Sequence, residues 1–153
     1  MGSKDFIDEL ASVKGNTDSG ANGPALMAIR DYLEESSTKQ ELALLQKLYL
    51  KRLEILETIL TSSGLKSAGG TDGGFFSLWH CPKALDGIQI TTAEEFNNLM
   101  IEKYGVIGVP FSGAILADGT REQFIRYAVC APLEDAQFAQ KVHNVFSQIS
   151  ITY

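Results

Sequence analysis

The residue best suited to chemistry in this sequence is an arginine inside an apolar strand. Arg126 lies in the run Gln123–Val129, whose other members are mostly aromatic, β-branched or small, as in a buried or half-buried strand. Because side chains alternate along a strand, Phe124, Arg126 and Ala128 share one face. An unpaired guanidinium in apolar surroundings costs several kcal/mol, so we expect Arg126 to face an anion or a wet cleft.

Two kinds of anion would satisfy Arg126. A planar guanidinium forms two parallel hydrogen bonds to a carboxylate, which suits the carboxylate of a small ligand. The alternative is a structural salt bridge to an Asp or Glu of the chain itself, because such ion pairs are common. Arg121 lies in a polar segment just before the run, and we expect it to be a solvated charge.

The other reactive side chains do not form a recognisable site. Cys81 and Cys130 are far apart and belong to no CxxC motif, and His80 and His143 are similarly isolated. We therefore expect reduced structural thiols and structural histidines, with no metal site and no activated nucleophile. The glycine-rich segment 69–74 precedes a strand and lacks a following Lys-Ser or Lys-Thr, so we interpret it as a sharp turn rather than a phosphate cradle.

Composition narrows the classes of partner. The 153 residues are 44% hydrophobic and 21% charged, which is close to the globular average, and the net charge of −6 comes without a basic block. Nucleic acid is therefore not an expected partner. The sequence shows neither the roughly 20-residue apolar run of a membrane span nor a signal-peptide core, so we expect a cytoplasmic protein with no membrane partner.

The elements that position Arg126 follow from apolar periodicity and turn residues. Their predicted order is helix, helix, long helix, strand, helix, strand, strand, helix. Helices are expected over Lys4–Val13 (ended by Gly15), from Pro24 through Leu33, over Thr38–Ser63, from a cap at Thr91 or Thr92 (with Glu94 or Glu95) to Gly105, and from Pro132 through Ile149. Strands are expected over Phe75–Trp79, Val106–Pro110 and Phe124–Val129. An eight-residue loop is expected over Asn16–Gly23, and Asp118-Gly119 predicts a turn.

The long helix is the strongest of these predictions. Thr38 and Glu41 form a T-x-x-E capping box, and Gly64 provides the stop. Its apolar positions cover more than one stripe, so we expect a helix packed on more than one side, shared by two lobes or two chains or simply long. The order of elements indicates an α/β or α+β layer in which helices cover a small sheet.

Four stretches, taken in order, resemble the rear portion of class I/II, fold-type I PLP-dependent aminotransferases. The likeness extends from about Asp5 to Gln148, and it rests on the joint order of the motifs. The stretches are Val13–Gly20 (VKGNTDSG), Asp72–Phe76 (DGGFF), Tyr104–Pro110 (YGVIGVP) and Phe124–Ala128 (FIRYA). The resemblance implies that 1–38 is the tail of the cofactor-binding large domain. It also implies that 39–153 is the interdomain helix and the small C-terminal domain, an α+β domain with a small, mostly antiparallel sheet.

The resemblance also implies roles for individual residues. Arg126 corresponds to the arginine that binds the substrate α-carboxylate, and Phe75 would lie near the substrate. Residues Asn16, Thr17, Asp18, Ser19 and Gly20 would lie near a subunit interface. The parent reaction would be a PLP-dependent amino-group transfer between an amino acid and a 2-oxo acid, carried out by a dimer.

The cofactor-binding residues of that family lie N-terminal to the region matched. No catalytic or cofactor-binding residue is therefore expected in this chain, and the chain alone should be inactive because it lacks the Schiff-base lysine. The family's Pro-Gly appears here as Pro110-Phe111, which changes the loop on the substrate side. Two alternatives are a stand-alone module that binds small carboxylates and a helix-mediated oligomerisation protein. Expected partners are an amino or 2-oxo acid and either a second copy or the large domain.

Overall fold

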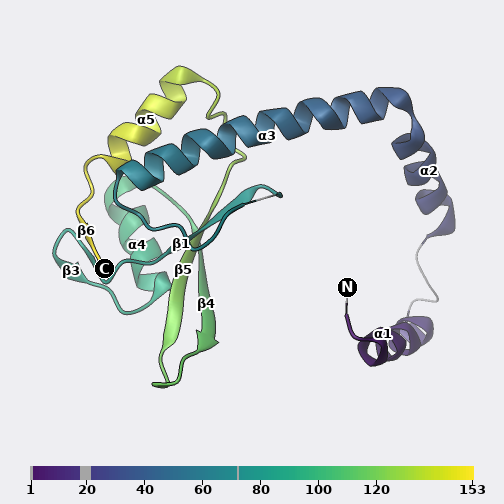
Figure 1. Ribbon diagram of the computed structural model, residues 1–153, viewed down its shortest axis with the longest axis horizontal. Coiled ribbons are helices and arrows are strands. Elements are labelled where there is room, and N and C mark those ends of the chain that lie inside the picture. Colours follow the sequence, from purple (N-terminus) through teal and green to yellow (C-terminus); the bar gives the residue numbers. More distant parts are fainter. Residues whose placement is uncertain (1, 18–21, 72) are drawn as a thin grey trace. The chain divides into compact units, whose positions relative to one another are not determined.

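The computed structural model describes residues 2–17, 22–71 and 73–153. The elements follow one another along the chain as Figure 1 shows, and they divide into two compact units, Met1–Leu44 and Leu45–Tyr153. The boundary falls inside the long helix. The division into a large-domain tail and a small domain that the resemblance implies stays a prediction.

The N-terminal unit is helical. Helix α1 spans Lys4–Thr17 and α2 spans Gly23–Glu34. The predicted end of α1 at Gly15 is wrong, because Gly15 does not adopt the left-handed conformation that usually ends a helix. The start of α2 is confirmed: the side chain of Asn22 caps it by accepting a hydrogen bond from the backbone N–H of Ala25 at 3.2 Å.

Helix α3 spans Ser36–Ser62 and crosses from one unit into the other. The predicted capping box is wrong because the helix begins before Thr38, which places that residue inside the first turn. The carboxylate of Glu41 instead accepts a hydrogen bond from the Tyr32 hydroxyl at 3.3 Å. Burial changes along the helix: Leu44 is 66% exposed and Leu60 is fully buried. Packing on more than one side is therefore confined to the second half of α3.

A three-stranded antiparallel sheet forms the centre of the C-terminal unit. Its strands are β1 (Phe76–His80), β4 (Val109–Ile115) and β5 (Arg121–Ala128), in the spatial order β1-β5-β4. The hairpin between β4 and β5 turns through Asp118-Gly119 as expected, with Gly119 at a φ of 82°. The expectation of a strand over Val106–Pro110 was placed too early, because the residues before Val109 are bonded to helix α4.

A second sheet was absent from the sequence prediction. The short strands β2 (Ala84–Leu85), β3 (Ile88–Gln89) and β6 (Ile151–Thr152) pair in the order β3-β2-β6, all antiparallel. The turn between β2 and β3 is Asp86-Gly87, and both residues have positive φ, at 51° and 78°. That geometry is the one a two-residue hairpin turn requires.

Two helices complete the C-terminal unit. Helix α4 (Ala93–Tyr104) packs against β4 and β5. Of the caps predicted for it, the structure forms the box of Thr92 and Glu95, and the predicted end at Gly105 is confirmed, with that glycine in the left-handed conformation. Helix α5 (Ala136–Phe146) starts later than predicted from Pro132. The physical reason is that the residues before it are used otherwise: the Asp135 carboxylate caps the helix, and the preceding glutamate forms an ion pair with α3.

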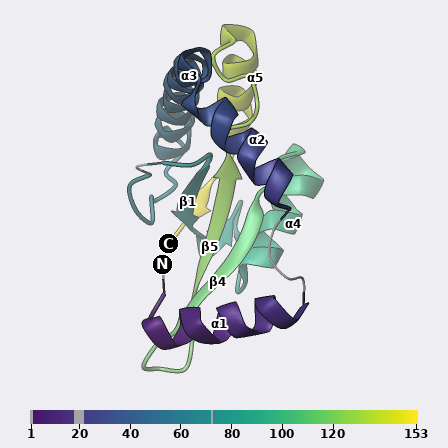
Figure 2. The ribbon, with the colours of Figure 1, turned by 90° about the vertical axis from the view of Figure 1, so that its right-hand side faces the viewer.

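The core lies between the helices and one face of the larger sheet. In Figure 2 the three strands lie in front of α4. The buried side chains of the core come from α3, α4 and α5 and from the inward positions of β1 and β5. Those that are almost fully buried include Leu60, Trp79, Phe96, Met100 and Ile125. The predicted mixed fold, with helices covering a small antiparallel sheet, is confirmed at this level. Within the described residues, no helix combines the length and apolarity needed to cross a membrane.

Candidate functional site

The two faces of β5 differ in their surroundings, although Phe124, on the face opposite the core cluster, is itself only 9% exposed. Ile125 and Tyr127 point inward, are 0% and 5% exposed and belong to the hydrophobic core. Phe124, Arg126 and Ala128 lie on the opposite face, as strand alternation predicts. None of these three is part of the core cluster. We call this opposite side of the β1-β5-β4 sheet the outer face.

Arg126 lies in the middle of the outer face. Strand pairing places Leu78 of β1 directly opposite it on one side and Val109 of β4 opposite it on the other. Its guanidinium carbon lies 5.0 Å from the centroid of the Phe76 ring, a cation–π contact. The side chain is partly buried, and its Nε atom is inaccessible to solvent. An aromatic ring and aliphatic side chains therefore surround the one charge.

No protein anion satisfies Arg126 among the described residues. Its buried Nε has no hydrogen-bond partner, and none of the ion pairs found in the described ranges includes it. The contrast with Arg52 is clear: that guanidinium donates Nε to one carboxylate oxygen of Glu134 at 2.6 Å and Nη2 to the other at 2.7 Å. Two kinds of anion were predicted for Arg126. Within the described residues, the structure shows no salt bridge from Arg126 to a carboxylate of the chain itself.

Aromatic rings extend the outer face beyond Arg126. The Phe124 ring lies 5.1 Å from the His80 ring and 6.2 Å from the Phe111 ring, centroid to centroid. Phe111 is 47% exposed and Val109 is 40% exposed, so this part of the face is open within the C-terminal unit. The candidate site is therefore a shallow apolar surface with one cation in its centre.

A deeper cavity of about 480 Å³ lies next to this surface but is a separate feature. Its walls come from α3, α4, α5, the segment before β4 and the end of β5, and they include Ile107 and Ala128 but not Arg126. Of the residues that line it, Lys141 alone carries a charge.

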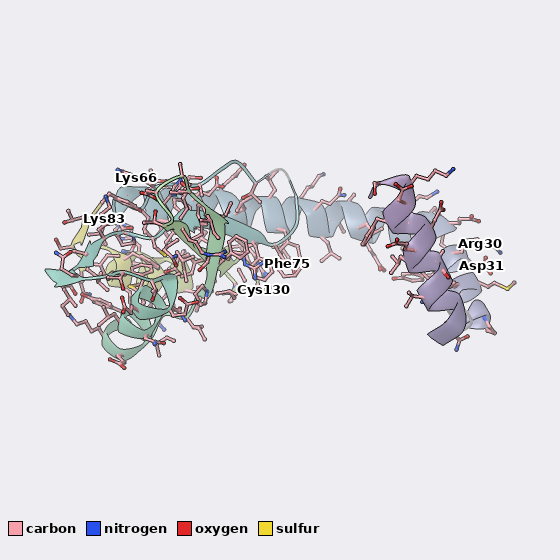
Figure 3. The ribbon with its side chains drawn as sticks, turned by 90° about the horizontal axis from the view of Figure 1, so that it is seen from below. Arg30, Asp31, Lys66, Phe75, Lys83 and Cys130 are labelled. Carbon is pink, nitrogen blue, oxygen red and sulfur yellow. The ribbon has the colours of Figure 1, made fainter. Side chains whose placement is uncertain are left out.

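The other residues predicted for the site are not all brought to Arg126. Phe75 immediately precedes β1, is 48% exposed, and has its ring 4.7 Å from that of Phe76. Its carbonyl accepts a hydrogen bond from the Val129 N–H at 2.9 Å, which fixes it at one end of the sheet, where Figure 3 labels it near Cys130. The Phe76 ring thus contacts both the Phe75 ring and the Arg126 guanidinium.

The predicted interface segment lies in the other unit. Asn16 and Thr17 form the last residues of α1, and Asp18, Ser19 and Gly20 lie outside the described residues. The role predicted for this segment is not tested by the fold. Arg121 is exposed, as expected for a solvated charge, and its guanidinium also donates to the Gly113 carbonyl at 3.2 Å.

Of the two cysteines, Cys81 is half-buried and Cys130 is exposed, so the expectation of a structural thiol fits Cys81 alone. Both cysteines are free thiols, and burial raises the pKa of Cys81 to about 12, which keeps that thiol protonated and unreactive at neutral pH. His80 contributes its ring to the aromatic contact with Phe124. In the described part of the chain, no three His, Cys, Asp or Glu side chains gather in a way that would hold a metal ion.

Sequence reasoning missed two polar clusters, both structural. One is the Arg52–Glu134 pair, which also holds the Cys130 carbonyl through Arg52 Nη1 at 3.1 Å. The other centres on Asp86, whose carboxylate accepts hydrogen bonds from the Tyr104 hydroxyl at 2.5 Å and the Ser150 N–H at 3.0 Å. These bonds lower the pKa of Asp86 and raise that of Tyr104 to about 12. The cluster fastens the small sheet to the end of α4.

Comparison with protein-family models, with curated proteins and with solved structures gave no significant match for this chain.

Proposed function

We propose that this chain binds the carboxylate of a small amino or 2-oxo acid through Arg126, as the small C-terminal domain of a fold-type I PLP-dependent aminotransferase. The observation that carries the proposal is a partly buried guanidinium whose inaccessible Nε has no partner among the described residues. A buried hydrogen-bond donor that its own fold leaves unsatisfied requires an external anion or water. The order of the four aminotransferase-like stretches supports a substrate carboxylate as that anion.

The surroundings of Arg126 favour a bound carboxylate over bulk water. Apolar neighbours lower the local dielectric, which strengthens a charge-assisted hydrogen bond between a guanidinium and a carboxylate. The contact with the Phe76 ring restrains the guanidinium plane before the ligand arrives, which reduces the entropy lost on binding. Two parallel N–H···O bonds would then orient the acid as well as hold it.

The same strands do not supply a site for PLP. A Schiff base with the cofactor needs a lysine amine, and none of the residues in β1, β4 and β5 is a lysine. We therefore assign carboxylate binding, and no step of amino-group transfer, to these residues. A module that binds small carboxylates without chemistry is the second candidate; it rests on the same unsatisfied Nε of Arg126 and needs no cofactor lysine.

Titration with L-alanine and pyruvate, followed by backbone amide shifts in β5, tests carboxylate binding. We expect saturable shifts with both acids and none with L-alaninamide, which lacks the carboxylate. Arg126→Gln should weaken binding roughly tenfold to a hundredfold, the usual range for a hydrogen bond to a charged group. Arg121→Gln is the matched control, because it removes an exposed arginine of the same strand, and it should bind as the wild type does.

Adding PLP to the same mixture tests the assignment of carboxylate binding without chemistry to this chain. The chain alone should form no product from an amino acid and a 2-oxo acid. Binding that is equally strong in Arg126→Gln would contradict the carboxylate role, and turnover by the purified chain would contradict the assignment of binding without chemistry to this unit.

A further inference from the structure

We infer that the acid bound at Arg126 is a monocarboxylate with an aromatic or branched apolar side chain, and that a second carboxylate does not strengthen binding. The inference rests on the proposed carboxylate site and adds the class of substrate. It comes from the residues that the strand register places around Arg126, because a ligand held by its carboxylate must lay the rest of its atoms over them.

The charge content of the outer face is the first step. Two outer-face residues of β5 lie next to Arg126, and strand pairing places further residues of β1 and β4 opposite these three. None of these neighbours is a lysine, a second arginine, an aspartate or a glutamate. They are Phe76, Leu78, His80, Val109, Phe111, Phe124 and Ala128. Arg126 is thus the single permanent charge of this central part of the face, and it can hold one carboxylate.

The second step concerns the tail of the ligand. Phe111 and Val109 are 47% and 40% exposed, so they present apolar surface that a ligand tail can cover. Both lie on β4, beside the part of β5 that carries Arg126. Each methylene removed from water there should tighten binding about fourfold, and a phenyl ring adds the offset or edge-to-face contacts that aromatic pairs prefer.

The third step is the cost of a second carboxylate. A dicarboxylate that uses one carboxylate on Arg126 would bring the other over aromatic and aliphatic side chains that offer no cation. Removing that group from water without a partner is unfavourable. The same surface that favours an apolar tail therefore disfavours a charged one, which gives selectivity in both directions.

The probes that test this are acetate, 3-phenylpropanoate, succinate and 3-phenylpropan-1-ol, each titrated into the full chain and followed by the amide shifts of β5. We expect 3-phenylpropanoate to bind at least about tenfold more tightly than acetate, from the apolar area it covers. Succinate should bind no better than acetate. The alcohol, which keeps the ring but lacks the carboxylate, should bind at least about tenfold more weakly than 3-phenylpropanoate.

Two variants assign the contributions. Phe111→Ser should reduce the preference for 3-phenylpropanoate over acetate severalfold, since Phe111 is half exposed and its replacement spares the core. Arg126→Gln should weaken both acids. Arg121→Gln serves again as the control, and far-ultraviolet circular dichroism of each variant checks that it is folded.

The outcomes distinguish the inference from the proposed function. If acetate and 3-phenylpropanoate bind equally well, or if succinate binds best, the substrate class is wrong while the carboxylate site stands. If no carboxylate binds in an Arg126-dependent way, the proposed function fails. If binding disappears as the protein concentration is raised, a second copy covers the outer face, and the inference of a ligand surface is overturned.

Discussion

The two units of this chain differ in how far their apolar side chains are buried. In the C-terminal unit, apolar side chains of helices and strands bury one another around Trp79 and Phe96, which are 1% and 0% exposed. In the N-terminal unit, the apolar positions of α1 and α2 are exposed: Phe6 and Met27 are both 58% exposed, for example. Among the described residues, the first buried hydrophobic side chain in chain order is Leu53.

This difference indicates which unit holds its own structure. Helices of 14 and 12 residues, such as α1 and α2, are marginal in water unless an apolar face is packed against something. Their exposed faces are of the kind that a second copy or a large domain, the two partners expected from the sequence, would cover. The candidate carboxylate site lies entirely in the C-terminal unit, which contains the buried hydrophobic core.

Two leucines of α3 give the largest expected contrast. Leu60 is 0% exposed and Leu44 is 66% exposed, although both occupy the same helix. Leu60→Ala should lower the free energy of unfolding by about 2–5 kcal/mol, because it leaves a cavity in the core. Leu44→Ala should change it by less than about 0.5 kcal/mol, as exposed substitutions usually do.

Urea denaturation of the two variants measures this contrast in one experiment. Since both substitutions replace Leu by Ala within a helix, differences in helix propensity largely cancel. An equal loss in both variants would mean that the first half of α3 is as well buried as the second, and the comparison between the two units would fail.

How far the sequence predicts the fold depends on element length. Long periodic segments such as α3, and capped ones such as α4 with Thr92, were found because each carries several independent signals. The β2–β3 hairpin was missed because strands of two residues cannot show alternation. Asp86-Gly87 between apolar neighbours was the available signal, since this dipeptide favours two-residue hairpin turns.

For the candidate site, the sequence predicts which face of β5 carries Arg126 but not which group pairs with its guanidinium. Alternation along β5 correctly separates Arg126 from Ile125 and Tyr127. Whether a carboxylate of the chain reaches Arg126 depends on tertiary placement, which no local pattern encodes. Arg52 illustrates the same limit: its partner Glu134 is 82 residues away in sequence, and neither helix period nor capping rule connects them.

Acid titration sharpens the comparison with a smaller effect. The hydrogen bond from Arg52 lowers the pKa of Glu134 from 4.5 to about 2. A carboxyl whose folded pKa is depressed contributes stability that is fully present above the unfolded value of 4.5 and is lost as the pH falls toward 2. We expect Arg52→Gln to reduce stability at pH 7 and to flatten its decline between about pH 5 and pH 2.

The matched pair in the N-terminal unit is Arg30 and Asp31, which Figure 3 labels. Their side chains are 62% and 63% exposed, so their contact at 2.7 Å is solvated and screened. Arg30→Gln should leave the pH dependence of unfolding as in the wild type. Thermal unfolding at several pH values measures both variants, and an unchanged acid profile in Arg52→Gln would show that the Arg52–Glu134 pair does not contribute in solution.

Removing a helix cap from each unit should give the smallest difference in unfolding between the two units. The Thr92 hydroxyl accepts a hydrogen bond from the Glu95 N–H at 3.2 Å and caps α4, which packs on the larger sheet. Thr92→Ala should therefore lower the global free energy of unfolding by about 1 kcal/mol. Asn22 caps α2, so Asn22→Ala should reduce helix content seen by circular dichroism without shifting the main urea transition. A shift of that transition by Asn22→Ala as large as that by Thr92→Ala would mean that the two units unfold as one, because a cap contributes to global stability only when its helix melts with the core.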